Sequence, residues 1–516
     1  MSATIATLPT IPTTATTLTI FPFFHVVVLS LCQLLNTASY MSTAPLAPFI
    51  VLHYFPQMPA REWGLYTGVL EGAFHAGGVP AAFFWSQFAD VHGRRPAILW
   101  GLLGTIFSVF LFGFAPNFAT AVTARFLWGA LNGNIGIIKT SLSERTSNAH
   151  AARAFSFIGF TSGVGRLTGP AIGGLLAFPA VNFGWTDKIW RDYPFSLPCI
   201  VMGFLTLLNL AAAYFVLEET KGRVEEDEVS LVAAAAAVDE ALKEEAPADS
   251  DADDVEAENV GLIVQPPDRV VVSTGFACPA RSAGFAPTNP VPASLTRNSW
   301  SSLWSDNLLR TALSIYASLG LLVLISQEVL SLLLVLPVSE GGYALTSRDL
   351  GFLALSTGVP LLLTQAFLFA PLVERYGVLR ILFGSLLGFG VLVMCHPALT
   401  LLATITTSEQ QWIALLTLSW ATCIVRVSAF TAVFIVVANS ALPVDRARAN
   451  GLGQALVSLV RAIGPPIFTP LFAMTIAQGA YTLQAVFVWF ILAAAAVYTA
   501  WIAHNLPPSA SLKRTA

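Results

Sequence analysis

The chain contains twelve stretches of about 20 or more mainly apolar residues, and this pattern limits its fold more than any other feature. They cover roughly 22–50, 63–88, 97–115, 118–141, 153–178, 195–217, 307–337, 348–373, 378–396, 411–440, 449–474 and 480–504. About 20 apolar residues form a helix long enough to cross a bilayer, and in lipid the helix satisfies its own backbone polar groups. We therefore expect an all-α integral membrane protein with twelve transmembrane helices.

The charge distribution supports this expectation. Of 516 residues 55% are hydrophobic and 11% charged, whereas a soluble domain carries about 25% charged residues. The segment 218–306 holds 18 acidic and 6 basic residues, which leaves 12 acidic and 20 basic residues elsewhere. A sparsely charged, mildly basic body with one acidic insert excludes a soluble enzyme, a nucleic-acid-binding protein and a disulfide-stapled secreted domain.

The acidic insert divides the spans into six before it and six after it. We expect a disordered cytoplasmic tail at 1–20, a six-helix bundle at 21–217, a largely disordered acidic loop at 218–306, a second bundle at 307–504 and a tail at 505–516. The loop is acidic and then rich in Pro, Ser and Gly, which is typical of disorder. A solvated spacer, or a regulatory or sorting segment, would fit this composition.

Orientation follows from the basic residues in the short loops. With the N-terminus inside, the outside loops hold only Arg61, Lys188, Arg191 and Arg348, and the inside loops hold the larger share. We therefore expect both termini and the insert in the cytoplasm. The first 20 residues contain no Lys or Arg and resemble neither a secretory signal nor a mitochondrial transit peptide. The plasma and vacuolar membranes both remain open.

Three short patterns recur six spans apart. An acid followed three residues later by Gly occurs at Asp90 and at Glu374, and R-x-x-G-P begins at Arg166 and at Arg461. The fourth and tenth spans also carry one Arg each, Arg125 and Arg426. Because the three patterns occur in the same order in both halves, we expect the halves to be parallel repeats.

The run from Trp85 to Arg95 contains D-x-x-G-R-R and resembles the inside loop typical of the major facilitator superfamily. The resemblance implies that Asp90, Gly93, Arg94 and Arg95 latch the cytoplasmic gate, and Glu374 would do so in the second half. Gly suits the tight turn between two helices. A charged turn that only sets topology is the other interpretation.

Two further runs carry the resemblance. Arg125-Phe-Leu-Trp-Gly129 resembles the fourth-span motif, in which the Arg faces the cavity and assists proton coupling. The small residues of the fifth span, with Gly169-Pro170 at their centre, are similar to the antiporter motif, which favours exchange over uptake. Leu217-Glu218-Glu219-Thr220 stands where sugar porters have a P-E-S-P-R-like run.

Several patches resemble the zinc-induced facilitator-like branch, including Ser326-Gln327-Glu328 and Gly341-Gly342-Tyr343. The first span departs from that branch, because it has Gln33-Leu-Leu-Asn-Thr37 in place of an Arg and an acid followed by Pro. The second span has Glu71 and His75 where small or apolar residues are usual.

An ionisable side chain in mid-membrane costs about 2.5–3.5 kcal/mol on insertion scales and is functional by default. The spans contain Glu71, His75, Arg125, Arg166, Glu328, Arg426 and Arg461. Glu71 and His75 are four residues apart and share a helix face, so they could bond directly, as a proton relay or as a structural pair. One Glu and one His are too few ligands for zinc, and we expect no metal site.

Glu328 stands alone in an apolar run, where burial favours its protonated form. The resemblance places spans one, four, seven and ten around the cavity, which would make Arg125, Glu328 and Arg426 neighbours. Arg166 and Arg461 flank Pro residues and fit either gating or substrate contact.

The sequence thus predicts a secondary transporter of the major facilitator type, a proton-coupled antiporter that exports a small organic molecule or metal chelate by alternating access. A proton symporter for uptake and a transport-inactive receptor or scaffold are the alternatives. No P-loop is present, which argues against direct use of ATP, and we expect no cofactor, no nucleic acid and no enzymatic activity. The expected partners are a small-molecule substrate, protons and the lipid bilayer, with a monomer as the working unit.

Overall fold

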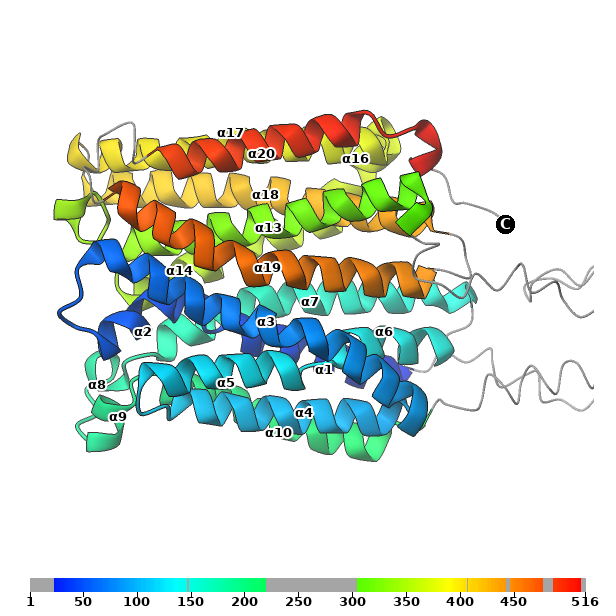
Figure 1. The fold of residues 1–516 in the computed structure, drawn as a ribbon, viewed down its shortest axis with the longest axis horizontal. Coiled ribbons are helices and arrows are strands. Elements are labelled where there is room, and N and C mark those ends of the chain that lie inside the picture. The colour runs from blue at the N-terminus through cyan, green and yellow to red at the C-terminus, as the bar shows by residue number, and fades with distance from the viewer. Residues whose placement is uncertain are drawn as a thin grey trace, which may run out of the picture.

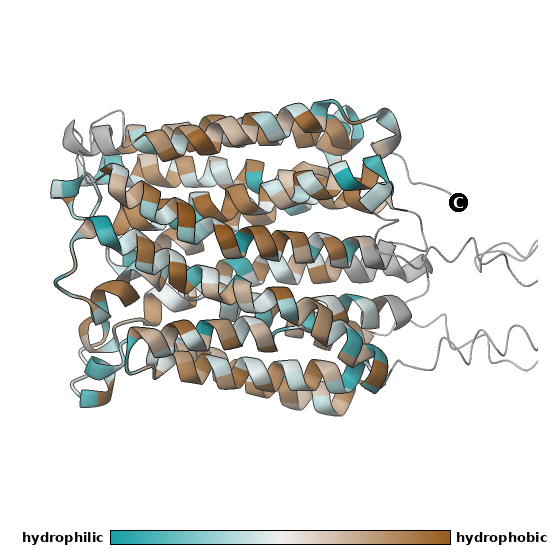
Figure 2. Ribbon diagram, viewed as in Figure 1, coloured by the Kyte–Doolittle hydropathy of each residue, from teal (hydrophilic) through white to brown (hydrophobic). Residues whose placement is uncertain are grey.

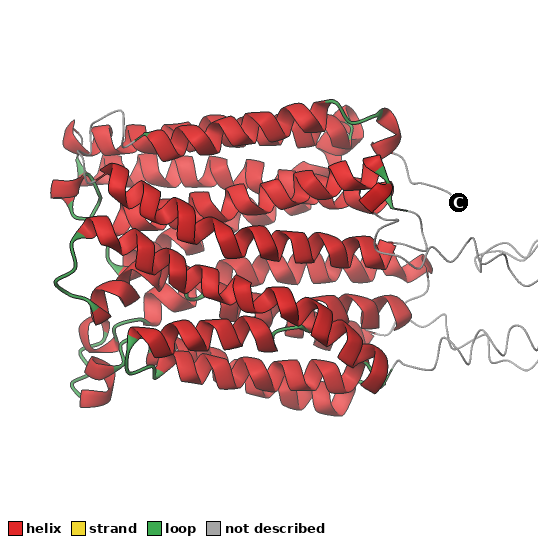
Figure 3. Cartoon of the chain, viewed as in Figure 1, coloured by secondary structure: helices red, strands yellow, loops and turns green. Residues whose placement is uncertain are grey.

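A computed structural model describes residues 23–145, 148–219, 304–405, 407–441, 446–476 and 486–511. Within these ranges all regular secondary structure is helical, and the long helices run side by side along one axis (Figures 1 and 3). The tail predicted for 1–20, nearly all of the acidic loop and the last five residues lie outside the described residues. The fold prediction of two parallel six-helix repeats is confirmed.

The first half supplies six crossings. The first consists of α1 (Phe23–Met41), η2 (Ala44–Leu46) and α2 (Ala47–Tyr54), and the next two are α3 (Ala60–His92) and α4 (Arg94–Gly113). The fourth consists of α5 (Phe118–Leu131) and α6 (Asn134–Arg145), the fifth is α7 (Asn148–Leu176) and the sixth is α10 (Ser196–Val216). Two short helices, α8 (Pro179–Asn182) and α9 (Lys188–Asp192), join the fifth crossing to the sixth.

The second half repeats this order. It begins with α13 (Asn307–Val335) and η4 (Val338–Glu340), and its eighth crossing consists of α14 (Ser347–Ser356), α15 (Gly358–Leu363), η5 (Thr364–Leu368) and α16 (Phe369–Tyr376). Then follow α17 (Val378–Ile405), α18 (Ser408–Ser440), α19 (Arg446–Ile476), α20 (Phe487–His504) and η7 (Pro508–Ser511).

Eight of the described crossings are long and apolar enough to span a membrane by length and composition alone. The second, fourth, fifth and eighth crossings are not among these eight, because they are interrupted or carry more polar residues. Apolar residues cover the body of the bundle and polar residues collect toward its two ends, as expected for a protein embedded in lipid (Figure 2).

The fourth predicted span, 118–141, is not one continuous helix. It is interrupted at Asn132 and Gly133, where a Cβ on Gly133 would overlap the Trp85 ring. The Trp85 indole N–H donates to the Ala130 carbonyl at 3.0 Å, and the Asn132 amide donates to Asn36 on α1. The eighth span is also interrupted, by a π-helical segment that follows Pro360. Because Pro360 has no N–H to donate to the carbonyl four residues earlier, the regular helix also breaks between α14 and α15, after Ser356.

Glycine makes the repeat-related turns. Gly93 joins α3 to α4 with φ 99°, and Gly377 joins α16 to α17 with φ 82°. Residues with a Cβ rarely adopt such positive φ values, so both turns depend on glycine. The motif that is repeated in the two halves of the sequence therefore also has the same backbone conformation at its glycine.

The two bundles meet along two seams of small residues. On one seam α3 packs against α19, and Cβ atoms on Gly64 and Gly68 would overlap Thr469 and Pro465. The Thr469 hydroxyl donates to the Gly64 carbonyl at 2.6 Å. On the other seam α7 packs against α14, where Gly174 lies against the backbone of Gly351. All these contacts lie toward the end that carries α8 and α9.

Toward the opposite end both seams open. Phe83 lies eleven residues beyond Gly72, on the same face of α3, and its side chain is 51% exposed. On α7, Gly163 meets only Leu361, and Gly159, one turn further, has no neighbour within 4 Å of a built Cβ. In Figure 1, α3 and α19 approach one another at the left and diverge toward the right. The bundles are thus closed at the α8–α9 end and separated at the end with the Gly93 turn.

Candidate proton and substrate site

A buried ion pair lies at the centre of the first bundle. Arg125 on α5 donates from Nη2 to Glu71 Oε2 on α3 at 2.6 Å, and both side chains are buried. The Arg125 guanidinium also lies 5.1 Å from the Phe74 ring centroid and 5.6 Å from that of Trp128. These rings stabilise the cation and exclude water, so the carboxylate is the main compensation for its charge.

The ion pair leaves hydrogen-bonding capacity unused. Glu71 Oε1 and Arg125 Nε and Nη1 are buried and have no hydrogen-bond partner among the described residues. Buried polar atoms without partners are rare in proteins and mark places where a further group, water or ion can act. The centre can therefore accept another hydrogen-bonding or charged partner.

The structure does not contain the direct bond between Glu71 and His75 that their spacing allows. Glu71 pairs with Arg125, while His75 Nε2 lies 3.3 Å from the Tyr40 hydroxyl on α1. The two side chains share a face of α3 but reach different neighbouring helices. Glu71 therefore pairs with a permanently charged guanidinium rather than with an imidazole.

Glu328 on α13 brings a second carboxylate to this centre from the other bundle. Its side chain is buried, and Oε2 has no hydrogen-bond partner among the described residues. It lies close enough to Glu71 and Arg125 to interact electrostatically with both. A second carboxylate thus lies within electrostatic range of the ion pair, while Arg125 forms its salt bridge with Glu71.

Arg426 does not join Arg125 and Glu328 as the resemblance implied. It is half-buried on α18, with Nη2 3.8 Å from Cys423 Sγ, and its charge interacts with Arg166 on α7. The structure brings Arg125 and Glu328 together, but it replaces Arg426 with Glu71. The sequence alone could not show this, because the rotation of each helix decides which of its faces meets the centre.

The predicted gate turn is held by a residue of the segment 218–306, for which the sequence predicts a disordered loop. Glu219, just beyond α10, accepts hydrogen bonds from the backbone N–H groups of Arg94 at 2.8 Å and Arg95 at 3.1 Å. A carboxylate is favourable at the N-terminus of α4, where the helix dipole is positive. Asp90 pairs with the Arg94 side chain at 3.0 Å. The sequence feature that could have indicated this contact is the pair of acids Glu218 and Glu219 directly after the sixth apolar span, because that span ends on the same side as the turn with Arg94 and Arg95.

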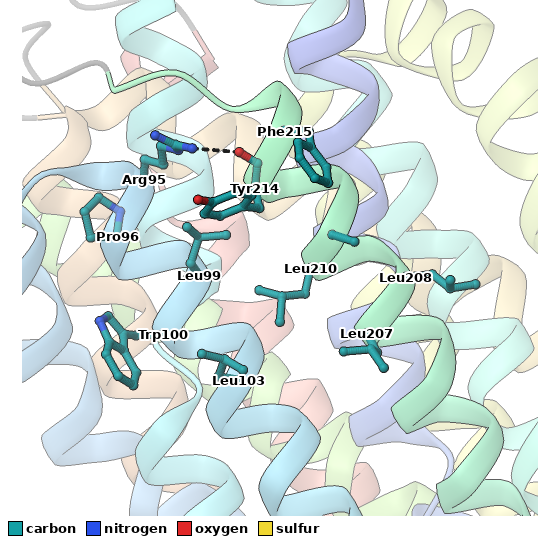
Figure 4. Close-up of a pocket in the computed structure, with 11 residues that line it drawn as sticks. Arg95, Pro96, Leu99, Trp100, Leu103, Leu207, Leu208, Leu210, Tyr214 and Phe215 are labelled. Atoms are coloured by element: carbon teal, nitrogen blue, oxygen red, sulfur yellow. Dashed lines mark hydrogen bonds between the residues drawn. The ribbon is translucent and has the colours of Figure 1, made fainter.

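Neighbouring contacts tie the same surface together. Glu218 pairs with Arg145 at the end of α6 at 2.6 Å. Arg95 donates from Nη2 to the Tyr214 carbonyl at 2.7 Å, which joins α4 to α10 (Figure 4). In the second half, Glu374 on α16 is exposed. Within the described part of the chain, the contacts around the predicted gate turn thus lie mainly in the first bundle.

The glycines of the predicted antiporter motif pack within the first bundle. Cβ atoms on Gly165 and Gly169 would overlap backbone atoms of α1, and one on Gly173 would overlap the backbone of Ser42 just after α1. Pro170 lies inside α7. The motif therefore holds α7 against α1, whereas Gly174 on another face of α7 contacts the second bundle.

One apolar surface recess lies away from the Glu71–Arg125 pair. It encloses about 650 Å³ on the flank of the first bundle between α4 and α10, and its lining is apolar apart from Arg95 and Tyr214 (Figure 4). Apolar walls on the flank of a membrane protein fit lipid chains, so we place the functional site at the charged centre. No group of three or more metal-ligating residues occurs in the described ranges.

The family follows from comparison with known proteins. Residues 29–347 match the model of the Major Facilitator Superfamily. The chain belongs to this superfamily. It is 29% identical over 478 residues to the major facilitator superfamily multidrug transporter mfsB of Aspergillus fumigatus, covering 87% of this chain and 78% of that protein. Protein ZINC INDUCED FACILITATOR-LIKE 1 of Arabidopsis thaliana is 26% identical over 450 residues, covering 86% and 83%.

The same fold occurs in a solved transporter structure. A D-xylose-proton symporter matches this major facilitator with a TM-score of 0.64 at 12% identity, covering 95% of this chain and 98% of the symporter. At this identity the likeness concerns the fold alone. The family and the fold make the protein a multi-pass membrane transporter for a small molecule, not an enzyme.

Proposed function

We propose that this major facilitator is a proton-coupled antiporter that exports a small organic molecule or a metal chelate. The observation that carries the proposal is the buried Glu328 carboxylate facing the Glu71–Arg125 pair across the two bundles. A carboxylate held in an apolar environment exchanges a proton as its electrostatic surroundings change. Substrate that alters these surroundings then competes with the proton.

The coupling has a simple electrostatic basis. Glu71 and Arg125 belong to the first bundle and Glu328 to the second. The attraction between an ionised Glu328 and Arg125, and its repulsion from Glu71, depend on how the bundles sit. Protonation of Glu328 removes both the attraction to Arg125 and the repulsion from Glu71, and it thereby shifts the balance between inward-open and outward-open conformations. A proton that enters from outside thereby favours release of substrate to the outside.

The direction of transport has further support. The small-residue pattern of α7 resembles the antiporter motif, and a relative over most of the chain is named a multidrug transporter. Another relative has a name that refers to zinc induction, and for this reason we include a metal chelate among the proposed substrates. Symport and a transport-inactive scaffold are the outcomes that the experiment below separates from antiport.

We also propose that both termini face the cytoplasm, in the plasma or vacuolar membrane. Then the closed α8–α9 end is the outer end and the structure represents an inward-open state, with Asp90, Gly93, Arg94 and Arg95 at the inner gate. A single chain contains both bundles and the whole charged centre, which supports a monomer as the transporting unit.

The decisive variant is Glu328→Gln in proteoliposomes with an imposed pH gradient. A panel of organic cations, organic anions and zinc identifies a transported probe for the wild-type protein. The variant should lose transport driven by the pH gradient and keep exchange of labelled for unlabelled probe, because binding and conformational change remain. Glu340→Gln, in a loop of the same bundle, is the matched control and should transport like the wild type.

Unchanged gradient-driven transport in Glu328→Gln would exclude Glu328 as the coupling carboxylate. Accumulation of probe in the same direction as the proton flow would indicate a symporter. If no probe in the panel is transported or exchanged by the wild-type protein, the scaffold interpretation gains support.

A further inference from the structure

Two repeat-related arginines and two tyrosines gather between the bundles. Arg166 on α7 corresponds to Arg461 on α19, because the fifth and eleventh crossings hold equivalent places in the two halves. Tyr40 lies on α1 in the first crossing, and Tyr316 lies on α13 in the seventh. Each arginine interacts electrostatically with the other arginine and with both tyrosines. The four residues, two from each bundle, therefore form one cluster.

The cluster carries positive charge without a protein counter-ion. Arg461 Nε donates to the Gly320 carbonyl at 3.2 Å, and the Arg166 guanidinium lies 5.9 Å from the Phe430 ring centroid. Among the described residues, neither arginine has a carboxylate within ion-pair distance. Glu71, the nearby acid, forms its ion pair with Arg125. Arg426 adds a third cation within range of Arg166.

Such an arrangement is unfavourable until an anion binds. Like charges within range of one another repel, and a partly buried cation such as Arg461 is stabilised by a compensating partner. Arg166 is exposed although it lies between the bundles, so a solute can reach it. A guanidinium pair presents planar donors that match the oxygens of a carboxylate, sulfonate or phosphate.

We infer that Arg166 and Arg461 bind the anionic group of the transported molecule, which makes the substrate a small organic anion. The inference rests on the proposed transport function and names its substrate class. Tyr316 supports it, because its oxygen accepts a hydrogen bond from Gln454 Nε2 at 2.8 Å and its own O–H remains available to donate to an anion.

The surroundings of the cluster indicate an apolar, planar body for this anion. The Tyr316 ring lies 5.2 Å from that of Phe434 on α18, and Phe430 follows at 6.1 Å from Phe434. The Phe434 side chain is 44% exposed beside the cluster. Aromatic side chains offer faces on which a planar molecule can stack.

Anion binding also fits the transport cycle. Arg166 belongs to the first bundle and Arg461 to the second, so their mutual repulsion opposes approach of the bundles at this level. An anion between them replaces the repulsion with two attractions. Bound substrate therefore favours the occluded arrangement that precedes opening on the other side.

The test measures binding in nanodiscs without any pH gradient. The probes are 2-naphthoate, its neutral amide and the corresponding naphthylmethylammonium, which differ mainly in charge. Calorimetry and thermal stabilisation of the full-length protein should show binding of the naphthoate at least about tenfold tighter than of the other two, since charge-assisted hydrogen bonds supply the difference. Arg166→Gln and Arg461→Gln should each weaken naphthoate binding about tenfold or more, and the Arg→Lys variants should keep part of it.

Arg191→Gln on α9 removes an exposed charge and is the matched control, with wild-type binding expected. Equal binding of the three probes, no binding of naphthoate, or wild-type binding by both Gln variants would overturn the inference. The Lys variants, which retain the charge, distinguish loss of the site from loss of folding. Naphthoate binding without gradient-driven transport would leave the anion site standing and reject only the antiport proposal.

Discussion

Arg125 organises the charged centre because it is the one member that cannot lose its charge at physiological pH. It is fully buried, paired with Glu71 and surrounded by aromatic rings. An ion of this kind in a medium of low dielectric is stable only with its counter-ion in place. The need to compensate Arg125 is therefore what keeps an ionised carboxylate inside the first bundle.

Replacing Arg125 by Gln should destabilise the protein markedly, since it leaves Glu71 buried without its counter-ion. Breaking a buried pair from one side costs about 3–5 kcal/mol, and the double variant Glu71→Gln/Arg125→Gln should recover much of this loss. Thermal unfolding in detergent gives the order of stabilities.

Arg61→Gln serves as the control for Arg125, because Arg61 is exposed and forms only a 3.7 Å pair with Glu62. It should change stability by less than about 0.5 kcal/mol. Equal melting temperatures for Arg125→Gln and the wild type would show that the ion pair contributes nothing to folding.

At the scale of elements, α3 serves two purposes. Its glycines at 64, 68 and 72 allow α19 to approach closely, while Glu71 and His75 point to α5 and α1. With 3.6 residues per turn, Gly64, Gly68, Glu71 and His75 lie at i, i+4, i+7 and i+11 and therefore share one face of α3. Any movement of α3 against α19 therefore also carries the proton site.

Gly68→Ala should weaken the closed end of the bundle. The added methyl group would overlap Pro465 and Thr469, and overpacking of this kind costs about 1–3 kcal/mol. The population should shift toward conformations open at that end. Spin labels at Ile189 on α9 and Val338 on η4, both exposed and in different bundles, should report a longer distance.

Gly78→Ala provides a control on the same helix, because nothing lies within 4 Å of a Cβ built there. It should leave the distance distribution unchanged. An identical distribution for Gly68→Ala would mean that close packing of α3 on α19 does not hold this end shut.

The start of α4 offers a second prediction at this scale. Glu219→Ala removes the acceptor for the backbone N–H groups of Arg94 and Arg95. Hydrogen bonds to a charged group contribute about 1.5–3 kcal/mol, so these amides should exchange with deuterium about ten to a hundred times faster. Glu218→Ala is the neighbouring control: it removes the ion pair with Arg145 but neither amide contact, and Glu218 is 60% exposed. Similar exchange in the two variants would contradict the capping role of Glu219.

For the whole molecule, the closure at one end and the even number of crossings give a testable topology. We expect α9 outside and the Gly93 turn inside. In a background without native cysteines, Lys188→Cys should react with an impermeant maleimide on intact cells, or from the lumen in vacuoles, and His92→Cys only from the cytoplasm. Both positions are exposed. The reverse pattern would invert the proposed orientation.

Much of this architecture could be predicted from the amino-acid sequence. Apolar runs must become helices in lipid, so the number of crossings follows from composition, and the turn at Gly93 follows from its motif. The interruptions at Asn132 and within the eighth span were missed, because they depend on neighbours such as Trp85 that lie far away in the sequence.

The sequence by itself determined that the protein crosses the membrane twelve times in two related halves and that it carries a few buried charges. Only the tertiary structure decided how these charges are paired: Glu71 with Arg125, His75 with Tyr40 and Glu219 with the start of α4. It also brought Arg166 within electrostatic range of Arg461. Hydropathy fixes that a residue is inside the membrane, since transfer free energy depends on residue type alone. Pairing depends on how each helix is rotated and on which helices are neighbours, and packing across the whole bundle sets both.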